Sequence, residues 1–183
     1  LDHAAGVDIS KATSLDEVLN FAGFNFEVEQ TTVHTPEGAE IPNKHLLRRS
    51  DNDYILGVVG GKYTPVSNRV MLEPFHDLVM DYGAKYESAG VIKGGRKCWI
   101  SATLPESFSV PGRTGDVINQ RIVSLIGHDG LGRNSYFSIA NRLMCNNQIR
   151  LITSSGSESQ FRVSHTKNWE QQHASAAAGF RAA

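Results

Sequence analysis

The chain has 183 residues, of which 40% are apolar, and a formal net charge of −1. This length supports one substantial hydrophobic core, so we expect a single domain over residues 1–183. No apolar run approaches the roughly 18 residues of a membrane span, and the first residues lack a basic segment followed by an apolar stretch. The sequence therefore predicts neither a membrane helix nor a signal peptide, and we expect a cytoplasmic protein.

The small net charge hides an asymmetry along the chain. Residues 1–84 hold six Lys and Arg against 13 Asp and Glu, whereas residues 85–150 hold nine against four. A local excess of cations is what a phosphate-binding surface requires. Cations also accumulate on exposed strand faces because they keep a sheet soluble, and composition alone favours this second interpretation.

The first predicted elements are a short helix and a half-buried strand. Ser14 and Glu17 have the spacing of a capping box and Gly23 follows the last apolar position, which predicts a helix between these points. The segment Phe24–Gln30 then alternates apolar and polar residues, a pattern typical of a strand with one buried face. A loop is expected at Ile41-Pro42.

The middle of the chain predicts a hairpin followed by an amphipathic helix. The segments His45–Ser50 and Tyr54–Val59 are rich in strand-forming residues and flank a short polar turn, so we expect them to pair. The helix is expected to begin at Ser67 or Asn68, either of which can cap it, and Pro74 should lie in an early turn or bend the helix.

Two more hairpins are predicted further along. The segment Lys85–Leu104 is expected to fold back at Gly94-Gly95. The segments Arg121–Gly127 and Ser135–Ala140 are rich in β-branched and aromatic residues, and the glycine-containing loop His128–Asn134 separates them. Polar groups therefore collect at strand ends, where binding sites tend to lie.

The remaining sequence adds a short predicted strand at Phe161–Ser164 and a helix-forming run from Lys167 onward. Taken together, these elements predict an α+β fold in which a largely antiparallel sheet of hairpins is covered by one or two helices.

Four motifs in a fixed order suggest a family. They are Leu46–Asn68 (LLRRSDNDYILGVVGGKYTPVSN), Ala89–Leu104 (AGVIKGGRKCWISATL), Gly127–Gly130 (GHDG) and Asn141–Asn147 (NRLMCNN). The chain resembles the phage- and plasmid-borne family catalogued as domain of unknown function 932. The resemblance covers a core from about Thr13 to about His165 and leaves residues 166–183 as the start of a C-terminal helical segment. It implies a phage or plasmid setting but no defined activity.

The strongest candidate for a binding element is the tip of the second hairpin. Lys93, Arg96 and Lys97 cluster there, with Trp99 nearby. Such cations can hold a nucleic-acid backbone while an aromatic ring stacks on a base. Strand alternation puts Trp99 and Cys98 on opposite faces, so packing of Trp99 in a core is the alternative. Further candidate nucleic-acid contacts are Arg48, Arg49, Arg113, Arg121, Arg133, Arg142 and Arg150.

The family motifs offer a second, catalytic hypothesis. His128 and Asp129 could act with Cys145 as nucleophile, His128 as base and Asn146 or Asn147 as an orienting group. Asn141 begins the motif that contains Cys145. The apolar neighbours of Cys145 would, however, raise the pKa of its thiol rather than activate it. Asp129 and the glycine after it also form an ordinary turn pair, so structural roles remain open. The seven histidines are scattered and predict no metal site.

The sequence therefore predicts a binding protein more than an enzyme. We expect single-stranded DNA binding or annealing in recombination, with no cofactor. A helix-backed sheet of hairpins is similar in outline to Rad-fifty-two-type annealing proteins, which work as rings, so a homo-oligomer is expected by analogy. The alternatives are a protein-interaction module, such as an inhibitor of a host defence enzyme, and a Cys/His hydrolase.

Overall fold

The structure is a computed structural model that describes residues 6–109, 117–132, 134–139, 161–163 and 171. The larger of its two sheets contains β1 (Val7–Asp8), β5 (Lys85–Ile92), β6 (Lys97–Ser109), β7 (Val117–Gly127), β8 (Asn134–Ile139) and β9 (Phe161–Val163), in that spatial order. The smaller sheet contains β2 (Val28–His34), β3 (Glu40–Arg49) and β4 (Ile55–Gly60). The strand pairs are antiparallel, and the predicted α+β class is confirmed.

The two helices begin where the sequence predicted. Helix α1 (Leu15–Ala22) starts after Ser14, whose side chain accepts a hydrogen bond from the Glu17 N–H, and ends at Gly23 with a φ of 69°. Helix α2 (Asn68–Asp81) starts after Ser67, whose Oγ accepts from the Val70 N–H. Pro74 lies within α2.

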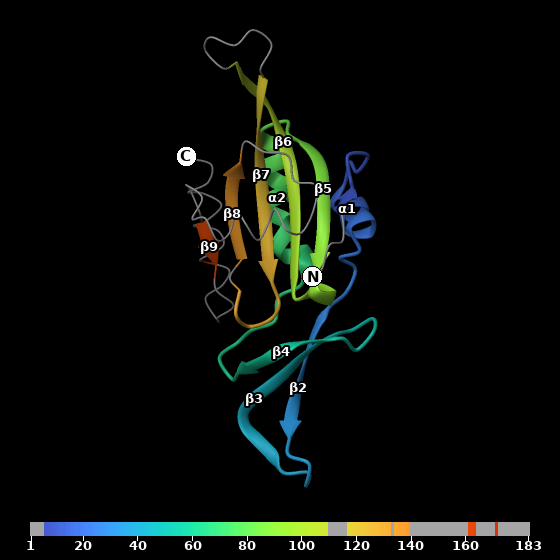
Figure 1. Cartoon of the computed structure of the whole chain (residues 1–183), viewed down its shortest axis with the longest axis vertical. Coiled ribbons are helices and arrows are strands. Elements are labelled where there is room, and N and C mark those ends of the chain that lie inside the picture. The colour runs from blue at the N-terminus through green and yellow to red at the C-terminus, as the bar shows by residue number, and fades with distance from the viewer. Residues whose placement is uncertain (1–5, 110–116, 133, 140–160, 164–170, 172–183) are drawn as a thin grey trace.

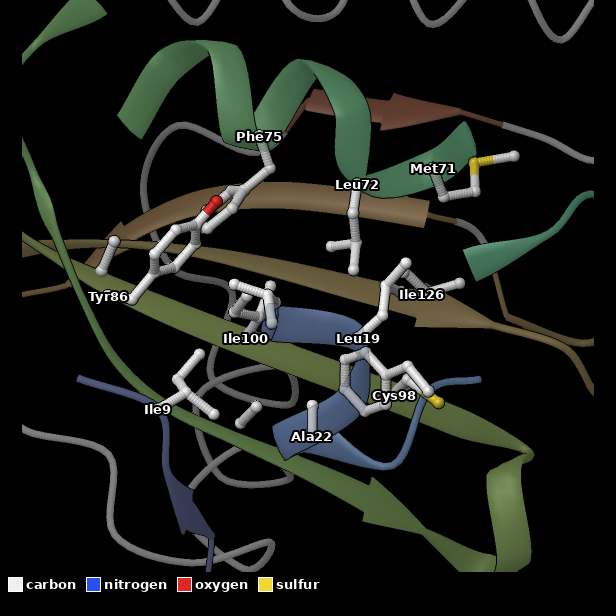
Figure 2. Packing of buried hydrophobic residues seen from close by; sticks show 14 of the residues in the cluster. Ile9, Leu19, Ala22, Met71, Leu72, Phe75, Tyr86, Cys98, Ile100 and Ile126 are labelled. Carbon is white, nitrogen blue, oxygen red and sulfur yellow. The ribbon is translucent and has the colours of Figure 1, made fainter. Parts of the chain in front are cut away.

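The main core lies between the two helices and one face of the large sheet (Figure 2). Phe75 of α2 and Leu19 of α1 meet Ile100 of β6 in this layer. The opposite face of the sheet carries a second buried cluster around Trp99, whose side chain is 0% exposed. Trp99 is therefore a core residue, as strand alternation allowed, and its ring is not accessible to a base.

Two sequence predictions in the N-terminal third were wrong in detail. The strand expected at Phe24–Gln30 begins only at Val28, because the preceding residues cross from α1 to the small sheet with Phe24 and Phe26 buried. The loop expected at Ile41-Pro42 lies inside β3. Pro42 is tolerated there because the β2–β3 register shifts next to it and β4 pairs with β3 only from Lys44 onward.

The sequence also predicted one sheet where the structure has two. Figure 1 shows the small sheet beyond one end of the large sheet, along the long axis of the molecule. Two connections of the large sheet lie at that end: the 3-10 turn η1 (Lys93–Gly95) between β5 and β6, and residues 128–132 of the connection between β7 and β8. The candidate site is built where these connections approach β4.

Candidate functional site

A cleft of about 460 Å³ opens between β4 and the two connections at the end of the large sheet. This volume lies within the usual range for ligand pockets. Its apolar and glycine lining comprises Leu56, Gly57, Val58, Ile92, Leu125 and Leu131. Its charged lining comprises Lys93, Arg96, Lys97 and Asp129. Three cations thus face the cleft with one carboxylate, and the walls between them are apolar.

The turn between β5 and β6 places the three cations together. Lys93, Gly94 and Gly95 all have positive φ values, of 49°, 65° and 108°, and glycine adopts this backbone region without strain. The backbone therefore reverses within a few residues. Arg96 follows the turn directly, and Lys97 is the first residue of β6. The predicted clustering of these cations at a hairpin tip is confirmed.

The Arg96 side chain is only partly satisfied by hydrogen bonds. Its Nη2 donates to the Ile55 carbonyl at 3.5 Å, and its buried Nε has no hydrogen-bond partner among the residues that the structure describes. Within the same residues, neither Arg96 nor Lys97 forms an ion pair. Part of the guanidinium is thus shielded from water, and its Nε–H still lacks an acceptor among the described residues.

The loop after β7 forms the opposite wall of the cleft and lies in direct contact with β4. A Cβ at Gly57 of β4 would lie 2.5 Å from the Asp129 carbonyl oxygen. A Cβ at Gly130 would lie 2.3 Å from the Cγ1 atom of Val59. These two glycines permit the close approach of the loop and the strand. The Asp129 carboxylate fixes the loop from within, because its Oδ1 accepts from the N–H groups of Leu131 and Gly132 at 2.9 and 2.8 Å.

His128 anchors this loop from behind. Its side chain is fully buried, and its backbone N–H donates to the Arg96 carbonyl at 2.8 Å. The side-chain amide of Asn68 donates to the Phe24 carbonyl, so the Asn68 Oδ1 accepts from the His128 Nε2, which lies 2.8 Å away. The ring of Phe26 meets the imidazole edge to face. His128 therefore joins the loop, the basic turn and α2, which is a structural role.

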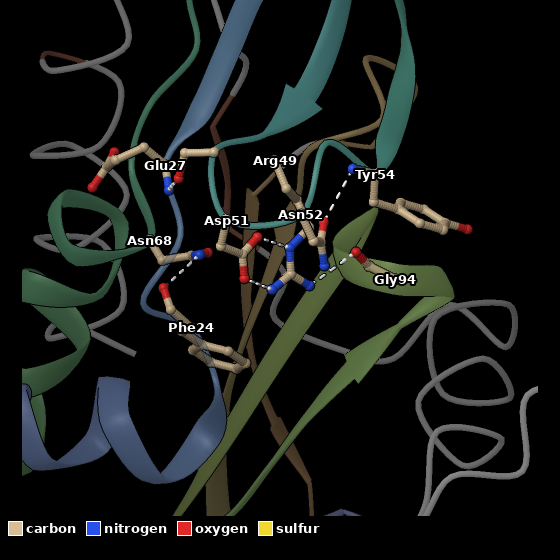
Figure 3. A network of polar contacts seen from close by, with 9 residues as sticks. Phe24, Glu27, Arg49, Asp51, Asn52, Tyr54, Asn68 and Gly94 are labelled. Atoms are coloured by element: carbon tan, nitrogen blue, oxygen red, sulfur yellow. Dashed lines mark hydrogen bonds and ion pairs between the residues drawn. The ribbon is translucent and has the colours of Figure 1, made fainter.

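Arg49 attaches the basic turn to the small sheet, as Figure 3 shows. Its guanidinium binds the Asp51 carboxylate through two hydrogen bonds of 2.8 and 2.6 Å, and its Nη1 donates to the Gly94 carbonyl at 3.0 Å. The same guanidinium lies 3.9 Å from the ring centroid of Phe26. Hydrogen bonding to Arg49 holds the pKa of Asp51 below its usual range. Arg49 is thus already engaged inside the protein.

Other predicted binding residues are also engaged elsewhere. Arg48 pairs with Glu29 and with Asp53, both at 2.9 Å. Arg121 is buried within the large sheet, where its Nε and Nη2 bind the two carboxylate oxygens of Glu87. Neither arginine lines the cleft. The predicted site residues outside the described part of the chain are Arg113, Arg133, Asn141, Arg142, Cys145, Asn146 and Arg150.

Sequence reasoning missed the apolar part of the site. Tyr54, Ile55 and Val58 come from β4 or the residue before it and are all substantially exposed. The ring of Tyr54 packs over Gly94, where a Cβ would lie 2.6 Å from two ring atoms. Leu131 is 92% exposed. The only local signal was the position of this leucine between two glycines.

The described residues contain neither a cluster of metal ligands nor a membrane-spanning helix. Among the described residues, no group of three or more His, Cys, Asp and Glu side chains could hold a metal ion. Neither described helix combines the length and the apolar character that a membrane crossing needs.

A family model described as "Domain of unknown function (DUF932)" matches residues 55–183. The chain belongs to this family. The DUF932 match starts at the first residue of β4, so every residue that lines the cleft lies within it. It begins later and extends further than the core predicted from about Thr13 to about His165. No curated protein and no solved structure matches the chain, so the outline similarity to annealing proteins is not confirmed.

Proposed function

We propose that this DUF932 chain binds single-stranded nucleic acid, with single-stranded DNA as the first candidate, in the cleft between β4 and the end of the large sheet. The observation that carries the proposal is the guanidinium of Arg96. The buried Nε of this group lacks a described hydrogen-bond partner. Arg96 also precedes Lys97, for which no ion pair is described. A change of the Arg96 rotamer would bring its Nε–H into the cleft, where a phosphate oxygen would supply the acceptor that it lacks.

The balance of charge in the cleft favours an anion. Lys93, Arg96 and Lys97 outnumber the single carboxylate of Asp129. One oxygen of that carboxylate already accepts two backbone N–H groups, which lessens its repulsion of a bound anion. The planar guanidinium matches the geometry of phosphate oxygens, and charge-assisted hydrogen bonds of this kind are stronger than neutral ones.

The apolar walls favour a single strand over a duplex. Val58 on β4 and Leu131 on the loop after β7 line the cleft and are exposed, at 55% and 92%. The faces and edges of bases are accessible in a single strand, where they can cover apolar surface while the backbone follows the cations. In a duplex the bases are stacked and paired, and the phosphates dominate the surface.

The biological setting belongs to the same proposal. A cleft of about 460 Å³ can hold only a short stretch of a strand. A homo-oligomer would align several such clefts and raise the affinity for a long strand, because each further contact becomes intramolecular. Strand annealing during phage or plasmid recombination would use such an array.

The test is a fluorescence anisotropy titration of an end-labelled single-stranded oligonucleotide. Arg96→Ala/Lys97→Ala removes two cations from the cleft, and Lys11→Ala/Lys85→Ala removes two exposed cations that do not line it. We expect salt-sensitive binding that weakens about tenfold or more in the first variant, as the loss of charge-assisted contacts predicts. The second variant should bind within about twofold of the unmodified chain.

Two results would count against the proposal. One is the absence of binding at low salt by a folded sample. The other is an equal loss of affinity in both variants, because that result would assign binding to overall charge and not to the cleft.

The exposed apolar residues beside the cleft favour a second candidate, which is contact with another protein chain. Tyr54, Ile55, Val58 and Leu131 are all exposed near the same edge of the molecule. Contiguous apolar surface often marks a protein interface. If this surface joins copies of the chain, Ile55→Ser/Val58→Ser should shift sedimentation velocity profiles toward monomer, whereas Arg96→Ala/Lys97→Ala should not.

A further inference from the structure

Leu131 is the most exposed large apolar residue in the described part of the chain. Its exposed fraction is 92%, and the next highest value is 55%, for Val58. A single exposed leucine is common on protein surfaces and needs no explanation by itself. The loop around Leu131 is unusual because it presents this side chain from a fixed backbone at the rim of the cleft.

The backbone of Leu131 is held from several directions. Its own N–H and that of Gly132 donate to the Asp129 carboxylate. A Cβ at Gly127 would lie 3.0 Å from backbone atoms of Gly132, so the start and the end of the loop are in contact. Gly130 lies against Val59 of β4. The loop is thus ordered before any ligand arrives, and binding would cost little further ordering entropy.

The same leucine lines the cleft that contains the cations. Leu131 and the residues Lys93, Arg96 and Lys97 all border this one cavity of about 460 Å³. A strand whose phosphates lie on the cations would therefore pass within reach of the leucine. Apolar side chains in comparable positions can insert between neighbouring bases, at an unstacking cost of a few kcal/mol per step.

We infer that Leu131 is a wedge that inserts between two bases of the bound strand and unstacks them. This inference rests on the proposed nucleic-acid binding. Insertion would remove from water a side chain that is almost fully exposed, and apolar burial offsets part of the unstacking cost. The cations would supply the affinity, and Leu131 would set the geometry of the bases.

The experiment uses a single-stranded oligonucleotide with one internal 2-aminopurine, whose fluorescence rises when the base loses its stacked neighbours. Anisotropy of an end label reports binding in a parallel titration. For the unmodified chain, we expect the 2-aminopurine emission to rise severalfold as the anisotropy saturates. Leu131→Ala should bind with an affinity within about fivefold and lose most of the rise in emission, whereas Leu131→Met should retain it.

A matched control removes an exposed apolar side chain elsewhere. Met80 of α2 is 50% exposed and does not line the cleft, so Met80→Ala should leave both signals unchanged. An undiminished emission rise in Leu131→Ala at saturation would overturn the wedge and leave the proposed function intact. If the unmodified chain binds without any rise in emission, the wedge is likewise overturned and the proposed function stands. No anisotropy change at all would overturn both proposals.

Discussion

Buried polar groups are hydrogen-bonded differently in two regions of the large sheet. One region is the face that the helices cover, and the other is the end of the sheet that faces β4. On the covered face, the Tyr136 hydroxyl donates to the Met71 carbonyl, and the Tyr86 hydroxyl is hydrogen-bonded to the Nδ1 of His76 at 2.6 Å. At the cleft end, the Arg96 Nε is buried without a described partner. Buried polar groups in folded proteins are nearly always satisfied, and the proposed binding of phosphate rests on this donor.

A buried hydrogen bond joins the two regions, and a partly buried one attaches the cleft end to the small sheet. The pair His128–Asn68 links the cleft loop to the first residue of α2, and Arg49 links the basic turn to the small sheet. The covered face therefore supplies stability, and these links position the cleft. The following variants should separate the two roles.

The largest expected effect on stability lies in the covered core. Phe75 is almost fully buried, so Phe75→Ala should lower the free energy of unfolding by about 3–5 kcal/mol through lost burial and cavity formation. Leu131→Ala should change it by less than about 0.5 kcal/mol, because that side chain is exposed. Urea denaturation followed by circular dichroism measures both. If both variants lose a similar free energy of unfolding, the covered core is not the main source of stability.

The link between the regions should matter next. Asn68→Ala removes the amide that binds both the Phe24 carbonyl and the His128 imidazole, which leaves two buried groups without this partner. We expect a loss of about 1–3 kcal/mol in the free energy of unfolding. Asn20→Ala at an exposed position of α1 is the control and should cost less. A neutral Asn68→Ala would show that the buried pair does not hold the loop.

The contact between β4 and the loop can be opened selectively. A Cβ at Gly57 would collide with the Asp129 carbonyl, so Gly57→Ala should cost about 1–3 kcal/mol and also weaken oligonucleotide binding. A Cβ at Gly60, in the same strand, would have no neighbour closer than 4.0 Å, and Gly60→Ala should affect neither property. Chemical denaturation and anisotropy are the measurements. If Gly57→Ala is destabilised but binds the oligonucleotide as tightly as the unmodified chain, the contact between β4 and the loop is not needed for binding.

A smaller effect should appear in acid. Arg49 holds the pKa of Asp51 below its usual value, so this pair stabilises the fold above the ordinary carboxyl pKa, and the contribution is lost as the pH falls through the lowered pKa. The Asp51 side chain is 41% exposed, so screening limits the contribution to below about 1 kcal/mol. Unfolding of the unmodified chain and of Arg49→Met, measured at pH 7 and pH 3, should show a smaller acid loss in the variant.

Cys98 should show no reactivity in the native protein. Burial raises the pKa of its thiol to about 12, so almost no thiolate is present at pH 8. Iodoacetamide should leave the peptide containing Cys98 unmodified in the folded chain and alkylate it in urea, as mass spectrometry can show. Rapid native alkylation would mean that the covered core opens readily.

Local features of the fold were predictable from sequence. The spacing of Ser14 and Glu17 predicted the start of α1, and Gly94-Gly95 predicted the turn that gathers the cations, because caps and turns depend on neighbouring residues. The separation into two sheets was not predictable in this way. Alternation identifies the strands, but it does not say which hairpins share a sheet.

The site was only partly predictable for the same reason. The partners of Arg121 and His128 are Glu87 and Asn68, which lie 34 and 60 residues away in the sequence. A count of basic residues could not show that Arg121 is already paired while Arg96 retains a donor. The exposure of Leu131 likewise depends on the packing of its loop against β4.

The most direct test is the salt dependence of oligonucleotide binding by the unmodified chain and by Arg96→Ala/Lys97→Ala. For single strands, the logarithm of the binding constant falls with the logarithm of the salt concentration by about 0.7 for each phosphate contact. If both cations bind phosphates, the slope of the variant should be shallower by about 1.4, and that of Lys11→Ala/Lys85→Ala should be unchanged. An identical slope for the cleft variant would contradict phosphate binding in the cleft.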